Sequence, residues 1–130
     1  MGYWKSQMNS YIAISFENFQ LEKEFFKNML HQSFQPYLSQ IIPLLQKHKI
    51  RSAYVFGSVL TDRFNEESDV DFLVNIEEGQ DPVEAGGHLW DLYDDLRKLL
   101  NREVDLLTER SLKNPYFIQQ VNQTKFSIYG

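Results

Sequence analysis

The sequence predicts a single α/β domain in which short strands alternate with helices. Its 130 residues fit one domain of ordinary size. Apolar residues make up 42% and aromatic residues 15% of the chain, which is enough apolar bulk to build a core. From residue 35 onward, helical and strand-like apolar spacings alternate, and the strands are too few and too widely spaced for a β-sandwich.

The first 33 residues differ from the rest and are interpreted as an N-terminal appendage. Residues 11–16 have the pattern of a short strand, and residues 18–30 carry apolar side chains at helical spacing. The Phe-rich face of this helix is typical of a core or of a contact between chains, so we expect the appendage to contribute an oligomer or partner contact. The main domain is expected to span residues 34–130.

The main domain is expected to begin with a helix and a buried strand. The helix starts from Gln35, because Pro36 suits a first turn, where its missing N–H costs nothing. Pro43 lies inside the apolar run and is expected to bend this helix. An apolar strand follows at 52–56 and ends at Gly57.

The middle of the chain predicts the clearest strand and the clearest helix. Every second residue over 70–76 is apolar, which predicts a strand with an apolar face of Val70, Phe72, Val74 and Ile76. The other face carries Asp69, Asp71, Leu73 and Asn75. Residues 77–82 are expected to form a turn. Leucine and tyrosine residues at helical spacing then predict a helix over 85–100.

The end of the chain predicts a strand, a short helix and an edge strand. Asp105 alternates with apolar neighbours, which predicts a strand over 103–107 with this carboxylate on the face opposite Val104 and Leu106. Asn114 and the proline after it open a short helix, whose buried side is expected to consist of Phe117, Ile118 and Val121. Residues 125–129 predict the last strand.

Composition and charge exclude several classes of protein. The chain has no cysteine, so disulfide frameworks, thiolate metal sites and cysteine nucleophiles are excluded. Its apolar runs fall far short of the roughly 20 residues that span a bilayer, and its first residues lack the order of a signal peptide. A net charge of −5 gives no dense basic face for a phosphate backbone. We expect a cytoplasmic protein with no membrane and no direct nucleic-acid partner.

Two aspartates that follow a polar loop predict a magnesium site. The strand that ends in Gly57 and Ser58 is followed, after ten residues, by Asp69 and Asp71. Aspartates at i and i+2 of a strand project from the same face. Such close like charges repel and are costly to desolvate unless a cation lies between them. Mg²⁺ takes one or two carboxylates and fills its other positions with water and substrate phosphates.

Gly57 and Ser58 are expected to hold the phosphates of a nucleotide. A glycine at the end of a strand lets the backbone approach a phosphate without a Cβ in the way. The turn into a short helix directs N–H groups and a positive dipole end toward an anion. The Ser58 hydroxyl adds one more hydrogen-bond donor.

Asp105 is the third candidate carboxylate. If its strand pairs beside the strand that holds Asp69 and Asp71, three carboxylates converge at one place. That arrangement suits two-metal phosphoryl or nucleotidyl transfer, in which one ion spans the triphosphate and the other lowers the pKa of the attacking hydroxyl.

These residues together resemble the minimal nucleotidyltransferase (MNT) proteins of the DNA polymerase β superfamily. The resemblance rests on Gly57 and Ser58, the ten-residue spacing to Asp69 and Asp71, and Asp105 on a later strand, and it runs from about residue 35 to the end. It implies the polymerase β-like nucleotidyltransferase fold, a small mixed β-sheet backed by helices, with ATP as substrate and a two-ion Mg²⁺ site. It further implies that Asp69, Asp71 and Asp105 bind metal, that Asp105 helps to activate the acceptor hydroxyl, and that Gly57 and Ser58 hold the β- and γ-phosphates.

The resemblance also implies a partner. Many MNT proteins are antitoxins encoded beside a HEPN-domain toxin, and some transfer AMP from ATP to a tyrosine of that toxin and silence it. Many members carry an arginine at the position that Thr61 holds here, whereas the first arginine of this chain after the motif is Arg63. We expect Arg63 to be a surface or salt-bridge residue.

Two other classes of function stay open. The chain could be a binding module that neutralises its partner by contact alone, with a vestigial or merely nucleotide-binding site. A nucleotidyltransferase that modifies an antibiotic or another small molecule is the weaker alternative, because 130 residues leave no room for a second substrate-binding domain.

Other polar features are expected to be structural. An acidic stretch on the helix at 85–100 is expected to be its solvated face: Asp91, Asp94 and Asp95. The histidines fall on no ligand spacing, so ordinary surface or half-buried positions are expected for His31, His48 and His88. The Gly86-Gly87 pair is expected to mark a ragged helix start or a point of close packing.

Overall fold

The computed structural model describes residues 29–130. The predicted strand at 11–16, most of the predicted helix at 18–30 and the contact expected of the appendage lie outside these residues. Met29 and Leu30, the last residues of that predicted helix, form a turn and a bend instead.

The described residues form a four-stranded sheet with three α-helices, as the sequence predicts for an α/β domain. In chain order the α-helices and strands are α3 (Leu38–Lys47), β1 (Ile50–Phe56), β2 (Val70–Ile76), α4 (Pro82–Leu100), β3 (Val104–Thr108), α5 (Pro115–Thr124) and β4 (Phe126–Tyr129). Three short 3₁₀ helices complete the list: η1 (Gln35–Tyr37), η2 (Gly57–Leu60) and η3 (Glu109–Ser111).

The sheet is mixed, with strand order β3-β2-β1-β4. β1 pairs antiparallel with both β2 and β4, and β2 pairs parallel with β3. A parallel pair needs a long crossover connection, which α4 supplies between β2 and β3. The pairing expected between the strands of Asp71 and Asp105 is therefore confirmed.

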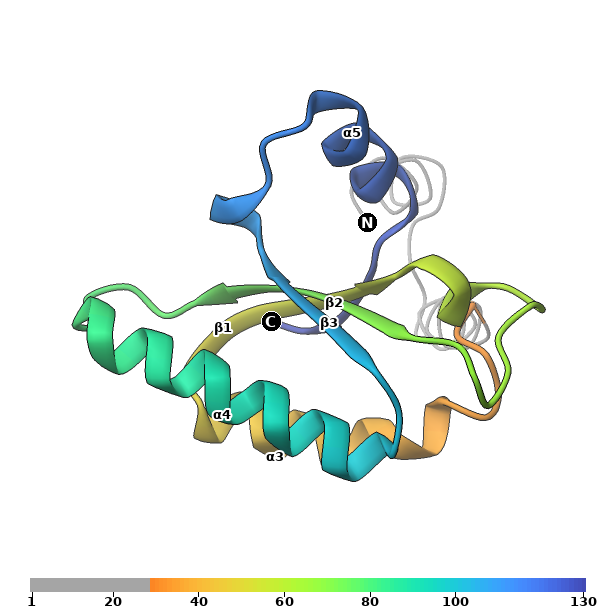
Figure 1. The fold of residues 1–130 in the computed structure, drawn as a ribbon, viewed down its shortest axis with the longest axis horizontal. Helices are drawn as coiled ribbons and strands as arrows, with labels where there is room; N and C mark the ends of the chain where they lie inside the picture. The colour runs from red at the N-terminus through yellow and green to blue at the C-terminus, as the bar shows by residue number, and fades with distance from the viewer. Residues whose placement is uncertain (1–28) are drawn as a thin grey trace, which may run out of the picture.

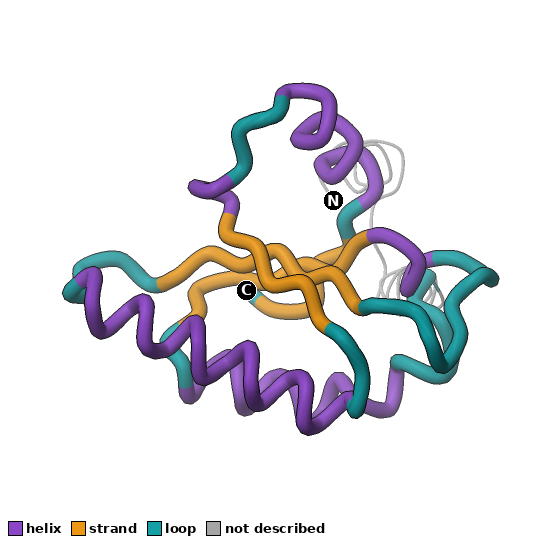
Figure 2. The backbone as a smooth tube through the Cα atoms, viewed as in Figure 1, coloured by secondary structure: helices purple, strands orange, loops and turns teal. Residues whose placement is uncertain are grey.

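Helices cover both faces of the sheet. Figure 1 shows α3 and α4 side by side on one face and α5 on the other, and Figure 2 shows the strands between these layers. The main core lies between the sheet and the α3–α4 layer, where Ile41, Phe72 and Leu92 are fully buried. A smaller cluster of Phe56, Leu73 and Val121 joins the opposite face to α5.

Residues just before η1 belong to the main core. Leu30 is 2% and Phe34 is 1% exposed, and both pack in that core. The backbone N–H of His31 donates to the carbonyl of Val59 in η2 at 2.9 Å. The segment that precedes the helical layer is thus tied to the turn that follows β1, and the division of the chain at residue 33 stays a prediction.

α4 begins earlier than predicted. The Asp81 side chain accepts the Glu84 backbone N–H at 3.2 Å, and Pro82 occupies the first turn, so residues assigned to a turn belong to the helix start. Gly86 and Gly87 lie inside the helix, and no atom lies within 4 Å of a Cβ built on either. The interpretation of this pair as a helix start or packing point is therefore wrong.

α5 also departs from its prediction in one respect. Asn114 caps it, with the side-chain oxygen accepting two backbone N–H groups, and Val121 is buried as expected. Phe117, expected on the buried side, is 36% exposed. Its ring meets only the edge of the small apolar cluster, at 6.1 Å from the ring centroid of Phe56.

Two further expectations concern helices. α3 continues through Pro43 after the 3₁₀ turn that contains Pro36. No helix among residues 29–130 is both long and apolar enough to cross a membrane.

Candidate functional site

Asp71 and Asp105 lie directly opposite each other on the parallel strands β2 and β3. Both side chains project to the face of the sheet that α5 covers, since Val70, Phe72 and Val104 fill the other face. The two carboxyl groups lie close enough for Asp105 to raise the pKa of Asp71. Sheet register therefore brings together two of the three predicted carboxylates.

The pKa of Asp71 is raised from 3.8 to about 7. Burial of the side chain is the largest cause, followed by the hydrogen bond with Asp105 and then by the negative charges of Asp105 and Asp69. Two carboxylates this close cannot both ionise without mutual repulsion, so Asp71 keeps its proton until the pH approaches 7. A cation is what would allow both groups to ionise.

Gly57 packs against Asp71. Its φ of +79° is the left-handed conformation that side chains disfavour, and a Cβ at this position would collide with Asp71 Oδ2. Because η2 also starts at Gly57, the backbone turn expected to hold phosphates sits beside the carboxylate expected to bind metal. Both the positive φ and the closeness of Asp71 therefore require a glycine at position 57.

Ser58 and Asp69 lie at the same end of the sheet. The Ser58 hydroxyl is 3.5 Å from the backbone carbonyl of Asp69, a long contact that nevertheless directs it toward the loop of the aspartates. Asp69 is exposed, comes one residue before β2, and adds its charge to the field at Asp71. The roles of these residues in binding metal and phosphate stay predictions.

Thr61 occupies the position where many MNT proteins have an arginine. Its hydroxyl donates to the Ser58 carbonyl at 2.8 Å, and its backbone N–H donates to the same oxygen at 2.9 Å. Thr61 therefore closes the η2 turn. Arg63 is exposed, as expected of a surface residue.

The donor atoms at this site fit magnesium in their chemistry. Among residues 29–130, no group of three or more acidic, histidine or cysteine side chains is arranged to hold a metal ion. Of the three carboxylates expected to converge, the sheet brings Asp71 and Asp105 together, and Asp69 acts on Asp71 through its charge. The close pair supplies hard oxygen donors and the unbalanced negative charge that a divalent cation neutralises, and Mg²⁺ commonly takes one or two protein carboxylates.

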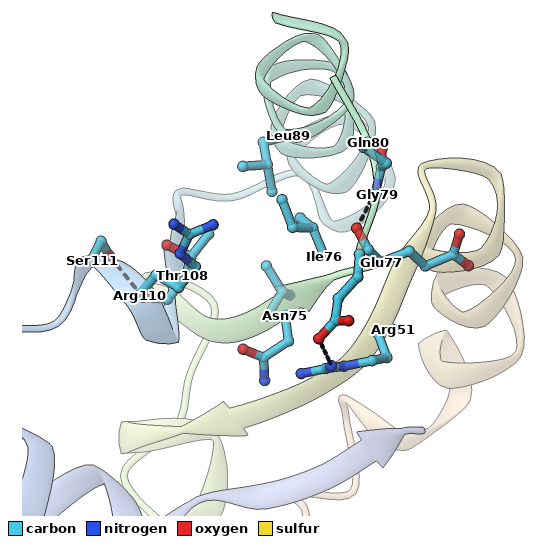
Figure 3. A pocket seen from close by; sticks show the side chains of 12 residues that line it. Arg51, Asn75, Ile76, Glu77, Gly79, Gln80, Leu89, Thr108, Arg110 and Ser111 are labelled. Atoms are coloured by element: carbon cyan, nitrogen blue, oxygen red, sulfur yellow. Dashed lines mark hydrogen bonds and ion pairs between the residues drawn. The ribbon is translucent and has the colours of Figure 1, made fainter. Parts of the chain in front are cut away.

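A cavity of about 800 Å³ lies farther along β2, and the sequence did not predict it. Figure 3 shows Asn75 and Ile76 of β2 on its wall, with side chains from β1, β3, η3 and α4 around them. Its rim carries basic residues (Arg51 and Arg110) and acidic ones, and Arg51 pairs with Glu78 at 3.3 Å. This mixture of charges does not single out an anionic ligand.

His48 and His88 meet between α3 and α4, contrary to the expectation of scattered histidines. His48 is 3% exposed; its Nδ1 lies 3.2 Å from His88 Nδ1, and its Nε2 lies 2.8 Å from Asp95 Oδ2. Asp95 is therefore more than part of a solvated face. His48 and Asp95 are 47 positions apart in the chain, so no local sequence pattern predicts their contact.

Comparison with known proteins decides the family. Residues 39–130 match the family described as polymerase beta, nucleotidyltransferase. The chain belongs to this nucleotidyltransferase family. The predicted fold, a small mixed sheet backed by helices, is confirmed by the sheet described above and by this match.

Two relatives of this nucleotidyltransferase come from Methanocaldococcus jannaschii and are named as candidate protein adenylyltransferases. MJ1379 is 33% identical over 94 residues, which cover 66% of this chain and 92% of the relative. MJ0435 is 38% identical over 73 residues, which cover 56% of this chain and 74% of the relative.

Solved structures of the same fold include toxin–antitoxin complexes. One is a crystal structure of a toxin–antitoxin with AMP-PNP, with 28% identity and a TM-score of 0.55 over 72% of this chain and 73% of the other. A second is the tri-AMPylated HEPN toxin of Shewanella oneidensis in complex with an MNT antitoxin, with 26% identity and a TM-score of 0.53 over 74% and 71%. A third, named as a candidate minimal nucleotidyltransferase, is 29% identical and has a TM-score of 0.53 over 72% of this chain and 91% of the other.

Proposed function

We propose that this nucleotidyltransferase transfers AMP from ATP to a tyrosine hydroxyl of a HEPN-domain toxin and thereby acts as its antitoxin. The observation that carries the proposal is the Asp71–Asp105 pair, set in register on parallel strands with Gly57 packed against Asp71. The relatives named for protein adenylylation and the solved toxin–antitoxin complexes support the kind of acceptor.

In this proposal the carboxylates hold magnesium. Mg²⁺, when bound, neutralises the triphosphate and lowers the pKa of the acceptor hydroxyl. Asp71 and Asp105 supply oxygen ligands from the two strands, and Asp69 supplies a third from the loop end. The charges of Asp105 and Asp69, which add to the effect of burial in raising the pKa of Asp71, favour a cation at this place.

The η2 turn holds the nucleotide tail. Gly57 lets the backbone lie against Asp71, so phosphates bound to the turn and metal bound to the carboxylates share one small region. Ser58 donates its hydroxyl to the β- or γ-phosphate. The nucleotide is thereby fixed with its α-phosphorus exposed to attack.

The chemical step is an in-line displacement at the α-phosphorus. The acceptor oxygen forms a new P–O bond, the bond to the β-phosphate oxygen breaks, and pyrophosphate leaves. Asp105, the exposed member of the pair, takes the hydroxyl proton. Positioning and charge neutralisation supply the rate enhancement, because the protein forms no covalent intermediate.

Residues 34–130 carry the whole of this site in our proposal. The residues expected to bind metal and nucleotide all lie between Gly57 and Asp105. Of residues 1–33, those that precede the buried Leu30 are proposed to serve partner or oligomer contacts instead.

Incubation with labelled ATP, Mg²⁺ and the HEPN protein encoded beside this chain tests the proposal. We expect label on a tyrosine of that protein, loss of its toxicity, and neither effect with Asp69→Asn. Asp91→Asn is the matched control, because Asp91 is exposed on α4, away from the carboxylate pair. Full neutralisation by the Asp69→Asn protein without any transfer would contradict the proposal and support neutralisation by contact.

A further inference from the structure

Asp69 is placed by a loop, unlike the other two candidate metal ligands. Asp71 and Asp105 are held by the hydrogen-bonded ladder between β2 and β3. Asp69 comes one residue before β2 begins, so its position depends on residues 61–69. The Val70 N–H donates to the Glu103 carbonyl at 3.2 Å, and the rest of the loop before Asp69 has to be held by contacts outside the sheet.

Arg102 makes the contacts that fix this loop. Its Nη1 donates to the carbonyl of Asn65 at 2.8 Å and to the carbonyl of Ser68 at 2.9 Å. Ser68 is the residue immediately before Asp69. Hydrogen bonds from a charged donor are about twice as strong as neutral ones, so these two contacts hold the end of the loop firmly.

The same guanidinium lies over an anchored aromatic ring. The central carbon of Arg102 is 4.5 Å from the ring centroid of Phe64, which is 5% exposed and packs edge-on against Phe34 in the main core. A cation over a buried aromatic face is attracted by the ring quadrupole. Arg102 therefore connects the loop to the core as well as to β3, which starts two residues later.

The loop is built to receive these contacts. Asn65 and Ser68 close a turn on each other, because Ser68 N–H donates to the Asn65 carbonyl at 3.1 Å and Asn65 N–H donates to Ser68 Oγ at 3.0 Å. The two carbonyls of that turn both accept from Arg102. With Nη1 donating to both carbonyls and one face lying over Phe64, the guanidinium is placed to support the loop.

We propose that Arg102 is a positioning residue for the metal site, which sets Asp69 beside the Asp71–Asp105 pair by clamping the turn at 65–68. The inference rests on the proposed function, since it assumes that these carboxylates hold Mg²⁺. Arg102 acts through the backbone of the loop and touches neither metal nor nucleotide.

Magnesium affinity of the full chain tests this inference. Mg²⁺ is titrated calorimetrically in the presence of a non-hydrolysable ATP analogue. Loss of a group that orients metal ligands commonly costs about 10- to 100-fold in metal affinity, and we expect a loss of this size in Arg102→Ala. Arg102→Lys keeps the charge but not the planar guanidinium, so its Mg²⁺ affinity should fall less than that of Arg102→Ala.

Arg97→Ala is the matched control. Arg97 also sits near the end of α4, pairs with Glu103 at 2.9 Å and lies 5.3 Å from the ring centroid of Tyr93. It makes no contact with the turn at 65–68 among those seen in the described residues, so its removal should leave Mg²⁺ affinity unchanged.

Hydrogen exchange separates positioning from general stability. In metal-free Arg102→Ala, amides of residues 65–69 should exchange faster while those of β2 and β3 keep their protection. Wild-type Mg²⁺ affinity in a folded Arg102→Ala protein would overturn the inference and leave the proposed function intact. If Arg102→Ala does not fold, unchanged affinity in Arg102→Lys overturns it in the same way. A wild-type chain that binds no Mg²⁺ would contradict the proposed function and this inference together.

Discussion

Asp71 and Asp105 face each other across two parallel strands, and burial together with the neighbouring carboxyl group raises the pKa of Asp71 to about 7. Such an arrangement destabilises a folded chain that has no cation bound, because burial and mutual repulsion both oppose ionisation. A divalent cation bound at the pair would neutralise this repulsion, so the proposed Mg²⁺ would gain affinity from it.

Asp71→Asn is expected to abolish adenylylation and to stabilise the metal-free protein. Removal of a charged metal ligand should reduce the transfer rate by more than about 100-fold. The amide carries no charge, so the repulsion within the pair disappears, and the free energy of unfolding at pH 8 with a chelator should rise. Urea titration measures this change, with Asp91→Asn as the control. Lower stability than the wild type in the chelator would contradict the origin we assign to the raised pKa.

The stability of the metal-free protein should fall as the pH rises from about 4 to about 7. The pKa of Asp71 is raised from 3.8 to about 7 in the folded state, so over this range the folded chain keeps a proton that the unfolded chain releases. The stabilisation that protonated Asp71 provides is complete at pH values below its pKa in the unfolded chain. It is lost as the pH rises through the pKa of Asp71 in the folded chain. Urea titrations across this range should show the slope in the wild type and a flatter profile in Asp71→Asn.

Magnesium affinity should rise with pH over the same range. Binding has to displace the proton of Asp71 below about pH 7, so the affinity should increase close to tenfold for each pH unit there and level off above it. Calorimetry in buffers of different ionisation enthalpy would show one proton released per Mg²⁺ at pH 6 and almost none at pH 8. Affinity independent of pH would place the metal elsewhere.

Strand β2 could be predicted from the sequence because its signal is local. It runs from Val70 to Ile76, the span in which every second residue is apolar and lies on one face. The role of the glycine before Ser58 could be predicted in the same way, since a glycine at the end of a strand commonly marks an unusual φ or a close approach to the backbone. The structure shows both at Gly57.

Contacts between distant residues could not be predicted from the sequence. Arg102 lies 34 residues from Ser68, and the side chains that line the cavity near Asn75 come from separate elements. Phe117 was expected to be buried because its spacing is helical, but α5 covers only the small apolar cluster. Periodicity identifies an apolar face and does not say how much surface is available to cover it.

Gly57→Ala should damage both folding and activity, and Gly79→Ala separates the causes. Both glycines have φ near +80°, but a Cβ meets Asp71 only at Gly57 and nothing within 4 Å at Gly79. The left-handed conformation alone costs roughly 1–2 kcal/mol in either variant. The collision should therefore make Gly57→Ala less stable than Gly79→Ala and deprive it of nucleotide transfer. Equal stability and equal activity of the two variants would show that Gly57 has no special contact with the site.

Gly86→Ala and Gly87→Ala should each stabilise the protein by about 0.5–1 kcal/mol. Both glycines lie inside α4, where glycine is less favourable than alanine by this amount, and the added Cβ meets no atom within 4 Å. Thermal unfolding of each variant with intact transfer activity checks the prediction. A destabilised variant would mean that α4 is not continuous through this pair in solution.

The link between α3 and α4 should weaken in acid through Asp95. Hydrogen bonding from His48 is the first cause that holds the pKa of Asp95 below its usual value of 3.8, and the nearby Lys47 lowers it further. A carboxyl group with a lowered pKa stabilises the fold at pH values above its pKa in the unfolded chain. This stabilisation is lost as the pH falls through the pKa of the group in the folded chain. Asp95→Asn should therefore cost on the order of 1 kcal/mol at neutral pH and nothing once Asp95 is protonated. Urea titrations of both proteins at neutral and strongly acidic pH measure the difference. Asp94→Asn is the control, because Asp94 lies on the same helix and has no contact with His48 in the described residues. An Asp95→Asn protein as stable as this control at neutral pH would show that the contact between His48 and Asp95 contributes nothing.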